Sequence, residues 1–290
     1  MSYPSAVKIV EVGPRDGLQN ESVSLDIVTK IELIERLANT GLKYIEAGSF
    51  VSPKWVPQMA GSDEVLNQLT PSQAVYTALT PNMRGLERAM ECNVKEIAVF
   101  AAASEAFSKK NINCSIDESL AKFEALIHKA YKANIRVRGY ISCVAGCPYQ
   151  GDVDNHRIKD IANALLSMGC YEVSLGDTIG VATPAVTERL LTELLKTIAP
   201  RKLAMHMHDT YGHAIDNIQQ SLVMGISTID SSVAGLGGCP YAKGASGNVA
   251  TEKVIELLDK LNIEHGVDLK KLSEVSQFIC EKLGRPAFAD

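Results

Sequence analysis

The segment Leu203-Ala204-Met205-His206-Met207-His208-Asp209 places two histidines in alternation with apolar residues. In an extended strand, successive side chains point to opposite faces, so His206 and His208 share one face. Two neutral imidazoles at this spacing are well placed to bind one divalent cation. A single buried histidine is more often an ordinary core residue, but this pair, followed by an acid, favours a metal site.

Outward from this segment, short apolar runs that predict strands alternate with segments in which apolar residues have helical spacing. Strands are predicted at 7–12, 44–48, 74–79, 95–100, 135–142, 172–175, 203–208 and 228–232. Helices are predicted at 25–38, 81–92, 115–133, 154–168, 183–198, 213–224 and 250–261, with an added C-terminal helix at 268–284. The segments 49–57 and 101–114 are predicted to be long irregular loops.

This alternation predicts an α/β protein with a single (β/α)8 barrel domain over residues 1–290. An open, doubly wound sheet is the alternative, but neither a GxGxxG nor a GxxxxGK[ST] motif follows the first strand. In such barrels the chemistry lies at the C-terminal ends of the strands. Functional side chains are therefore expected where each strand ends.

The composition is that of an ordinary globular protein, with 46% hydrophobic and 22% charged residues. A net charge of −5 without a basic run argues against nucleic acid and against an anionic membrane surface. No apolar stretch approaches the roughly 20 residues needed to span a bilayer. The seven scattered cysteines predict a reduced, cytosolic protein without disulfides, and the spacing of Cys143 and Cys147 is only a weak zinc signal.

Several charged residues follow or interrupt the predicted strands. Arg15 and Asp16 follow the first strand, where Asp16 is a candidate oxygen ligand; the alternative is an ion pair in a surface turn. Glu46 lies inside an apolar run, where a carboxylate is costly unless it is paired, so a structural salt bridge is equally plausible. Asp177 follows the sixth strand and is equally suited to capping the next helix.

The segment from Gly235 to Asn248, after the last strand, contains five glycines and one proline, which is typical of a lid. Cys239 near its centre is a candidate proton donor or acceptor, because the pKa of a thiol can be tuned towards neutrality. Asn248 offers an amide oxygen to a hard cation. The alternative is a flexible surface loop with an inert thiol.

Together these residues predict one cation, Mg²⁺, Mn²⁺ or Zn²⁺, held by Asp16, His206, His208 and Asn248. A metal with an open position beside Arg15 suits a substrate that chelates through a hydroxyl and a carbonyl or carboxylate. Carbon–carbon bond making or breaking of the aldol or Claisen type is the chemistry that this combination serves. A non-catalytic metal-binding barrel is the alternative from another class.

The Arg15-Asp16-Gly17-Leu18-Gln19 segment and His206-Met207-His208 resemble the metallolyase barrels that include isopropylmalate and homocitrate synthases and the 3-hydroxy-3-methylglutaryl-CoA (HMG-CoA) lyases. The similarity to the HMG-CoA lyases is carried by residues 12–21, 48–59, 109–115, 138–151, 174–180 and 238–252.

This resemblance implies retro-Claisen cleavage of an acyl-CoA substrate, HMG-CoA, to acetyl-CoA and acetoacetate, a reaction of leucine catabolism and ketone-body formation. It implies Mg²⁺ or Mn²⁺ as the cofactor, Arg15 as the group that stabilises the enolate, and Cys239 as a proton donor. His206 or Asp16 would accept the hydroxyl proton. Supporting or substrate-contacting roles are implied for Glu46, Asp177, Gln19, Arg138 and Asn111.

The resemblance also leaves rivals: a lyase for substrates with a longer acyl chain, and a condensing enzyme that uses an α-keto acid. A homodimer is the assembly that it suggests. Animal mitochondrial members carry a presequence and a cysteine-containing C-terminal tripeptide, and this sequence matches neither, which favours a bacterial-type cytoplasmic enzyme.

Overall fold

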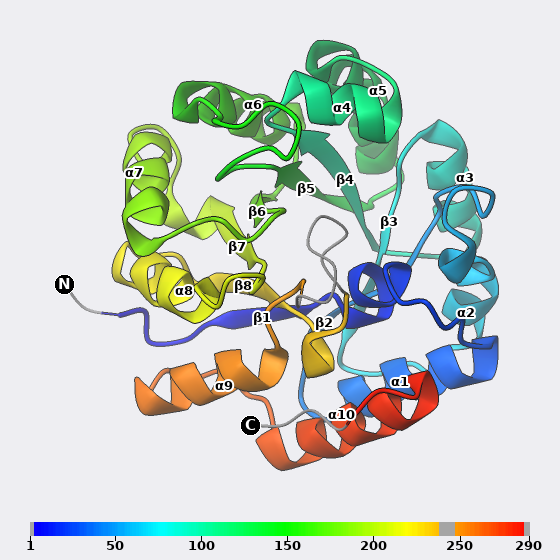
Figure 1. Ribbon diagram of the computed structural model, residues 1–290. Helices are drawn as coiled ribbons and strands as arrows, with labels where there is room; N and C mark the ends of the chain where they lie inside the picture. The colour runs from blue at the N-terminus through cyan, green and yellow to red at the C-terminus, as the bar shows by residue number, and fades with distance from the viewer. Residues whose placement is uncertain (1–2, 238–246, 287–290) are drawn as a thin grey trace.

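The computed structural model describes residues 3–237 and 247–286. Within them, eight parallel strands follow one another in chain order and close into a barrel through pairing of β1 with β8 (Figure 1). The strands are β1 (Lys8–Glu11), β2 (Tyr44–Ser49), β3 (Val75–Leu79), β4 (Glu96–Ala102), β5 (Arg136–Ser142), β6 (Glu172–Asp177), β7 (Leu203–Met207) and β8 (Thr228–Ser231). The predicted (β/α)8 barrel is confirmed, and the open-sheet alternative is wrong.

The helices form a ring around the strands (Figure 1). They are α1 (Ile27–Ala38), α2 (Ser62–Gln68), α3 (Met83–Glu91), α4 (Glu105–Ile112), α5 (Ile116–Lys132), α6 (Asn155–Met168), α7 (Pro184–Leu194), α8 (Ala214–Val223), α9 (Thr251–Lys260) and α10 (Leu269–Leu283). Short turns of 3-10 helix occur at η2 (Pro57–Met59), η3 (Pro200–Lys202) and η4 (Val233–Gly235). In the described part of the chain, no helix has the length and apolar character needed to cross a membrane.

Two helices were not predicted. The segment 101–114, expected to be irregular, contains α4, and α2 lies between the second and third strands. In α4 the side chain of Ser104 caps the first turn by accepting from the N–H of Phe107, but only two residues of this helix are buried. Neither helix shows a long apolar periodicity, so the local signal for a helix is weak. The other elements, including the added C-terminal helix, lie within a few residues of their predicted bounds.

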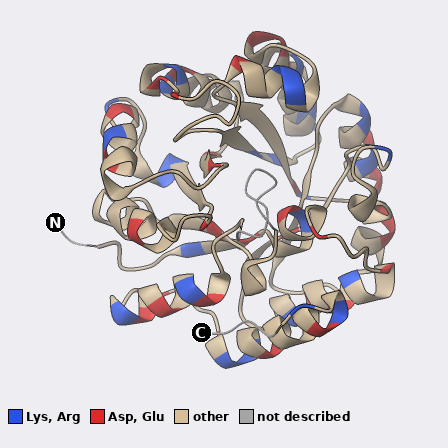
Figure 2. Cartoon of the chain, viewed as in Figure 1, with Lys and Arg blue, Asp and Glu red and all other residues tan. Residues whose placement is uncertain are grey.

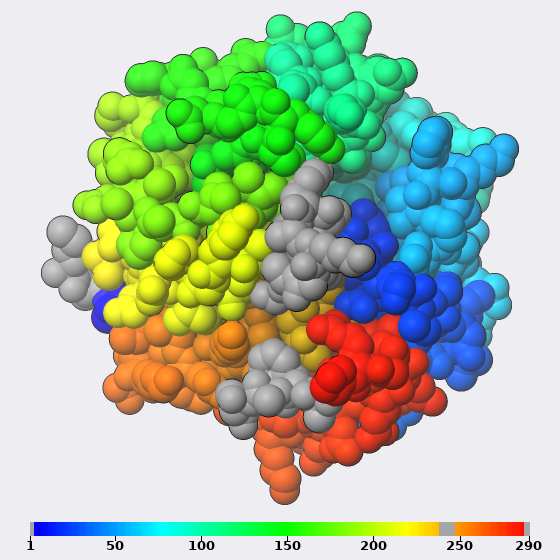
Figure 3. Space-filling view, viewed as in Figure 1, coloured from blue at the N-terminus to red at the C-terminus, as the bar shows by residue number. Residues whose placement is uncertain are grey.

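The first and last parts of the chain meet on one side of the barrel, where α1 and α10 pack side by side, blue and red in Figure 3. Gly41, after α1, has φ +103°, and a Cβ there would lie 2.2 Å from the carbonyl oxygen of Gly266. The N–H of Asp268 donates to the carbonyl of Thr40 at 2.7 Å. Only glycine permits this close approach of the two backbones.

The hydrophobic core lies between the strands and the helix ring, and its largest fully buried side chains are leucines and isoleucines. Charged residues of both signs are spread over the outer helices (Figure 2). The strands also carry buried charged residues, namely Glu11, Glu46, Glu96, Arg138, Glu172, Asp177 and Asp230. Buried charges are costly unless they are paired. These strand residues are therefore the positions at which the interior of the barrel is not purely apolar.

Candidate active site

The loop after β1 carries Arg15 and Asp16 in one turn of π-helix, η1 (Gly13–Gly17). The carbonyl of Val12 accepts from the backbone N–H groups of Arg15, Asp16 and Gly17 at 3.1, 2.7 and 3.2 Å. Such turns are rare and are found frequently at functional sites. The turn sets the directions of both charged side chains at the C-terminal end of β1.

Glu11, the last residue of β1, fastens this turn to the neighbouring loop. Its buried carboxylate accepts from the N–H of Gly13 at 2.8 Å, from the N–H of Val233 at 2.9 Å and from the hydroxyl of Thr251 at 2.7 Å. Burial raises the pKa of Glu11 to about 7, although these hydrogen bonds oppose the shift. Glu11 was not among the predicted site residues, although a carboxylate within an apolar strand was the signal used for Glu46.

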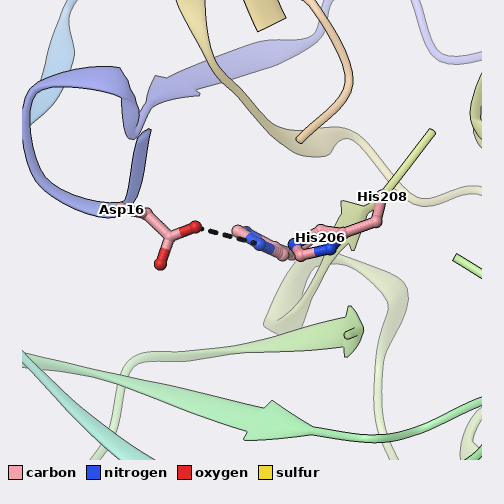
Figure 4. A group of neighbouring side chains, drawn as sticks. All are labelled: Asp16, His206 and His208. Carbon is pink, nitrogen blue, oxygen red and sulfur yellow. Dashed lines mark ion pairs between the residues drawn. The ribbon is translucent and has the colours of Figure 1, made fainter. Parts of the chain in front are cut away.

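His206 in β7 and His208 just after it lie at the same mouth of the barrel. Both residues are buried, and their ring centroids are 5.4 Å apart. Oδ2 of Asp16 lies 3.8 Å from Nε2 of His206, and Figure 4 shows the carboxylate pointing towards the ring. One ligand atom from each of the three residues lies within 4.8 Å of the others. Residues about 190 positions apart in the chain therefore converge on one point.

Asn248 joins this group from the segment before α9. It forms an isolated antiparallel bridge with His208. Its amide nitrogen donates to Oδ2 of Asp16 at 2.9 Å and to the carbonyl oxygen of Leu236 at 3.2 Å. Because both partners are acceptors, the hydrogen bonds assign the amide nitrogen to that side. The amide oxygen is the atom that remains for a cation.

These groups fit a divalent cation chemically. Burial, and then the neighbouring His206, lower the pKa of His208 to about 4, and Nδ1 of His208 is buried without a hydrogen bond among the described residues. Burial opposes ionisation of Asp16, but the charges of Arg15 and His206 outweigh it and lower the pKa of Asp16 to about 2. A neutral imidazole and an ionised carboxylate are the protonation states that bind metal. Burial lowers the pKa of His206, but Asp230 and Asp16 outweigh it and raise this pKa, so His206 would release its proton when a cation binds.

Arg15 is buried and held from two sides. Its Nε donates to Oε2 of Glu46 at 2.6 Å, and a terminal nitrogen donates to the carboxylate of Asp16. The guanidinium also lies 5.7 Å from the ring centroid of Tyr140. Burial raises the pKa of Glu46, although Arg15 opposes the shift. Glu46 thus forms the buried salt bridge that was the structural alternative for this residue, and the same contact orients Arg15.

Asp177 ends β6 and organises the turn that follows. Its carboxylate accepts from the N–H groups of Val181 at 3.1 Å and Ala182 at 2.8 Å, and burial raises its pKa. The N-cap of the next helix, α7, is Thr183, so the interpretation of Asp177 as its cap is wrong, and Asp177 instead holds the turn before that helix. A role in orienting the metal ligands stays a prediction.

Arg138, predicted at a substrate-contacting or supporting position, lies inside the barrel. Its Nε donates to Glu172 at 2.9 Å, and its terminal nitrogens donate to the hydroxyl of Tyr140 at 2.9 Å and to Oδ1 of Asp230 at 2.7 Å. The side chain is 4% exposed. Contact of Arg138 with substrate stays a prediction, whereas its contacts here connect β5, β6 and β8. Asp230 was not among the residues predicted from the sequence.

A cavity of about 840 Å³ opens at this mouth. Arg15, Asp16, Gln19, Asn111, His206 and His208 are among the residues that line it. Its wall also includes Trp55, Lys110 and Lys122, so apolar and cationic groups accompany the candidate ligands. Cavities of this size accommodate organic ligands of moderate size. Cys239 lies outside the described residues, and its predicted role as a proton donor is untested.

The closed barrel and the carboxylate–imidazole–amide group at its mouth define a candidate metal-dependent barrel enzyme. The chain belongs to the HMGL-like family, whose sequence profile matches residues 6–279.

Named relatives agree with this assignment. The chain is 57% identical over 286 residues to a 3-hydroxy-3-isohexenylglutaryl-CoA/hydroxy-methylglutaryl-CoA lyase of Pseudomonas aeruginosa, covering 98% of this chain and 95% of the relative. It is 52% identical to the mitochondrial hydroxymethylglutaryl-CoA lyase of Homo sapiens, covering 98% of this chain and 88% of the relative. A crystal structure of hydroxymethylglutaryl-CoA lyase from Pseudomonas aeruginosa superposes with a TM-score of 0.97 at 56% identity, covering 100% of this chain and 97% of that one.

Proposed function

We propose that the protein is a divalent-metal-dependent lyase that cleaves HMG-CoA to acetyl-CoA and acetoacetate. The observation that carries the proposal is the convergence of Asp16, His206 and His208 at one mouth of the barrel, beside the buried guanidinium of Arg15. The names of the full-length relatives support the substrate. These names do not favour the two alternatives, a non-catalytic metal-binding barrel and a lyase that acts only on longer acyl chains.

Asp16, His206, His208 and Asn248 would hold Mg²⁺ or Mn²⁺. When bound, this cation supplies Lewis acidity and lowers the pKa of the substrate hydroxyl. His206 or Asp16 accepts the proton of the tertiary hydroxyl. The bond between C2 and C3 then breaks, its electron pair passes to the thioester side, and acetoacetate is released with a new ketone carbonyl.

Arg15 faces the thioester side of the cavity in this proposal. Its guanidinium donates to the oxygen on which the enolate charge develops, and the pairing with Glu46 keeps it oriented before substrate arrives. Cys239 then supplies the proton that converts the enolate into acetyl-CoA. Gln19 and Asn111 line the cavity. In this proposal they would contact the acyl-CoA.

The experiment measures acetoacetate and acetyl-CoA from HMG-CoA with the purified protein. Equal amounts of the two products are expected with Mg²⁺ or Mn²⁺, with loss of activity in EDTA and recovery when the cation is restored. Absence of product with either cation would refute the proposal. Analogues with longer substituents at C3 are assayed in parallel, and faster turnover of these would reassign the substrate.

The proposal also covers the oligomeric state and the cellular role of the enzyme. A homodimer and a cytoplasmic role in leucine breakdown follow from the family resemblance. Light scattering coupled to size-exclusion chromatography tests the dimer, because a mass near the 31.3 kDa of one chain would exclude it.

A further inference from the structure

Behind His206 lies a buried polar chain that the proposed mechanism does not use. In the pairing of β7 with β8, His206 stands directly opposite Asp230. Nδ1 of His206 lies 3.4 Å from Oδ2 of Asp230, while Nε2 lies 3.8 Å from Oδ2 of Asp16. The two ring nitrogens therefore face two different carboxylates, one inside the barrel and one at its mouth.

Asp230 is itself held firmly. Its side chain is 0% exposed, and Arg138 donates to both of its oxygens, at 2.7 Å to Oδ1 and 3.1 Å to Oδ2. The hydroxyl of Ser174 donates to Oδ2 at 2.7 Å. Two-point pairing of a guanidinium with a carboxylate fixes the plane of both groups. Asp230 thus presents Oδ2 to His206 in a defined direction.

The carboxylate of Asp230 determines which ring nitrogen of His206 carries the proton. An ionised carboxylate only accepts hydrogen bonds, so a neutral His206 carries its proton on the ring nitrogen nearer to a carboxylate, which is Nδ1, at 3.4 Å from Asp230 against 3.8 Å between Nε2 and Asp16. A proton on Nδ1 leaves the lone pair on Nε2, the nitrogen that faces Asp16. The separation of 3.4 Å is longer than a good hydrogen bond, and such contacts commonly tighten when a site is loaded.

We propose that Asp230, anchored by Arg138, is a positioning residue that holds His206 in the tautomer protonated on Nδ1, which leaves the lone pair of Nε2, the nitrogen that faces Asp16, available to a cation. The inference rests on the proposed function for its catalytic consequence only, which is that Asp16 rather than His206 accepts the hydroxyl proton, because both ring nitrogens of His206 are then occupied. The tautomer and the metal affinity are properties of the protein that are measured without HMG-CoA.

The substitution Asp230→Asn tests this directly. Ser174 and Arg138 both donate to Oδ2, so the remaining amide oxygen takes that position and the amide N–H₂ group takes the Oδ1 position. The neutral amide oxygen is a weaker acceptor than the ionised carboxylate of Asp16, which faces the other ring nitrogen of His206. We therefore expect the proton of His206 to move to Nε2, as the loss of the carboxylate does in a serine-protease triad.

The first readout is ¹⁵N NMR of histidine-labelled, metal-free protein above pH 8, with the His206 signals assigned by comparison with His206→Gln. Wild type should show the Nδ1–H tautomer and Asp230→Asn the Nε2–H tautomer. A wild-type Nε2–H tautomer would overturn the proposal without any variant, so the test survives if Asp230→Asn fails to fold.

The second readout is the affinity for Mn²⁺ alone, measured by calorimetry. Partners behind metal ligands are typically worth about 10–100-fold in affinity, and Asp230→Asn should weaken binding within that range. The matched control is Glu172→Gln, which removes the other carboxylate bound to Arg138 but lies opposite Arg138 in the pairing of β5 with β6 rather than beside His206. Unchanged Mn²⁺ affinity in Asp230→Asn, or equal loss in Glu172→Gln, would refute the positioning role.

The outcomes separate this inference from the proposed function. If the tautomer and Mn²⁺ affinity respond as expected but HMG-CoA is not cleaved, the positioning role stands and the substrate is wrong. If HMG-CoA is cleaved and neither readout responds, the positioning role is wrong and the proposed function stands.

Discussion

Arg15 and Glu46 form a buried ion pair, with 2.6 Å between Nε and Oε2 and side chains 7% and 1% exposed. The pair joins the loop after β1 to β2, so the guanidinium is oriented before any ligand binds. This orientation makes the first two predictions specific.

The substitution Glu46→Gln removes the charge that holds Arg15. We expect the free energy of unfolding to fall by about 3 kcal/mol, because one member of a buried pair loses its partner. We also expect kcat to fall about 100-fold, since a small displacement of a reacting group has an effect of that size. Chemical denaturation and steady-state kinetics measure the two losses. The control Glu32→Gln disrupts the exposed pair with Arg36 and should change neither.

The substitution Arg15→Gln removes the donor to the developing enolate. We expect a loss of transition-state stabilisation on the order of 3 kcal/mol. Because Glu46 is left unpaired, stability should fall as well. The double variant Arg15→Gln/Glu46→Gln separates the two effects: stability should partly recover, but turnover should not. Turnover within tenfold of wild type in either variant would remove Arg15 from the mechanism.

Substitution of either imidazole should impair the metal site. Loss of a residue that contacts a metal ligand typically weakens metal binding about 10–100-fold. We expect His206→Ala and His208→Ala, which remove ligands themselves, each to weaken Mn²⁺ binding by more than this and to lower the cleavage rate in parallel. Calorimetry with Mn²⁺ and the acetoacetate assay provide the measurements. The exposed His128 in α5 supplies the control, His128→Ala, which should bind Mn²⁺ as wild type does. Full activity of His206→Ala after EDTA treatment would contradict the site.

The prediction for Cys239 rests on the acidity of its thiol alone, because this residue lies outside the described residues. A serine hydroxyl is a much weaker acid than a thiol, so Cys239→Ser should slow turnover while CoA-ester binding is retained. The measurement is kcat beside the Kd of a non-cleavable CoA ester. Unaltered turnover would leave this residue without a catalytic role.

Glu11 predicts a pH dependence of stability. Its pKa in the folded protein is about 7, against an ordinary 4.5, so the unfolded chain loses this proton first as pH rises. The contribution of Glu11 is therefore fully present below about pH 4.5 and is lost as pH rises towards 7, by up to about 3 kcal/mol at ~1.4 kcal/mol per unit. Urea unfolding of wild type and Glu11→Gln should show this as a difference that changes over pH 4.5–7. A difference independent of pH would contradict the shifted pKa.

Local patterns in the sequence predicted most of the architecture. Strand and helix order followed from apolar periodicity, and the shared direction of His206 and His208 followed from the two-residue repeat of a strand. The barrel then followed from the alternation. The helices α2 and α4 were not predicted because few of their residues are buried, which leaves little apolar periodicity to detect.

The sequence by itself therefore determined the elements, their order and the residue types available at the barrel mouth. Only the tertiary structure decided which of those residues meet: Asp16 with His206, Arg15 with Glu46, and Arg138 with Asp230. The physical reason is range. Strand periodicity is a property of the local backbone, whereas these contacts depend on the register between strands and on the closure of β1 against β8, which no single segment encodes.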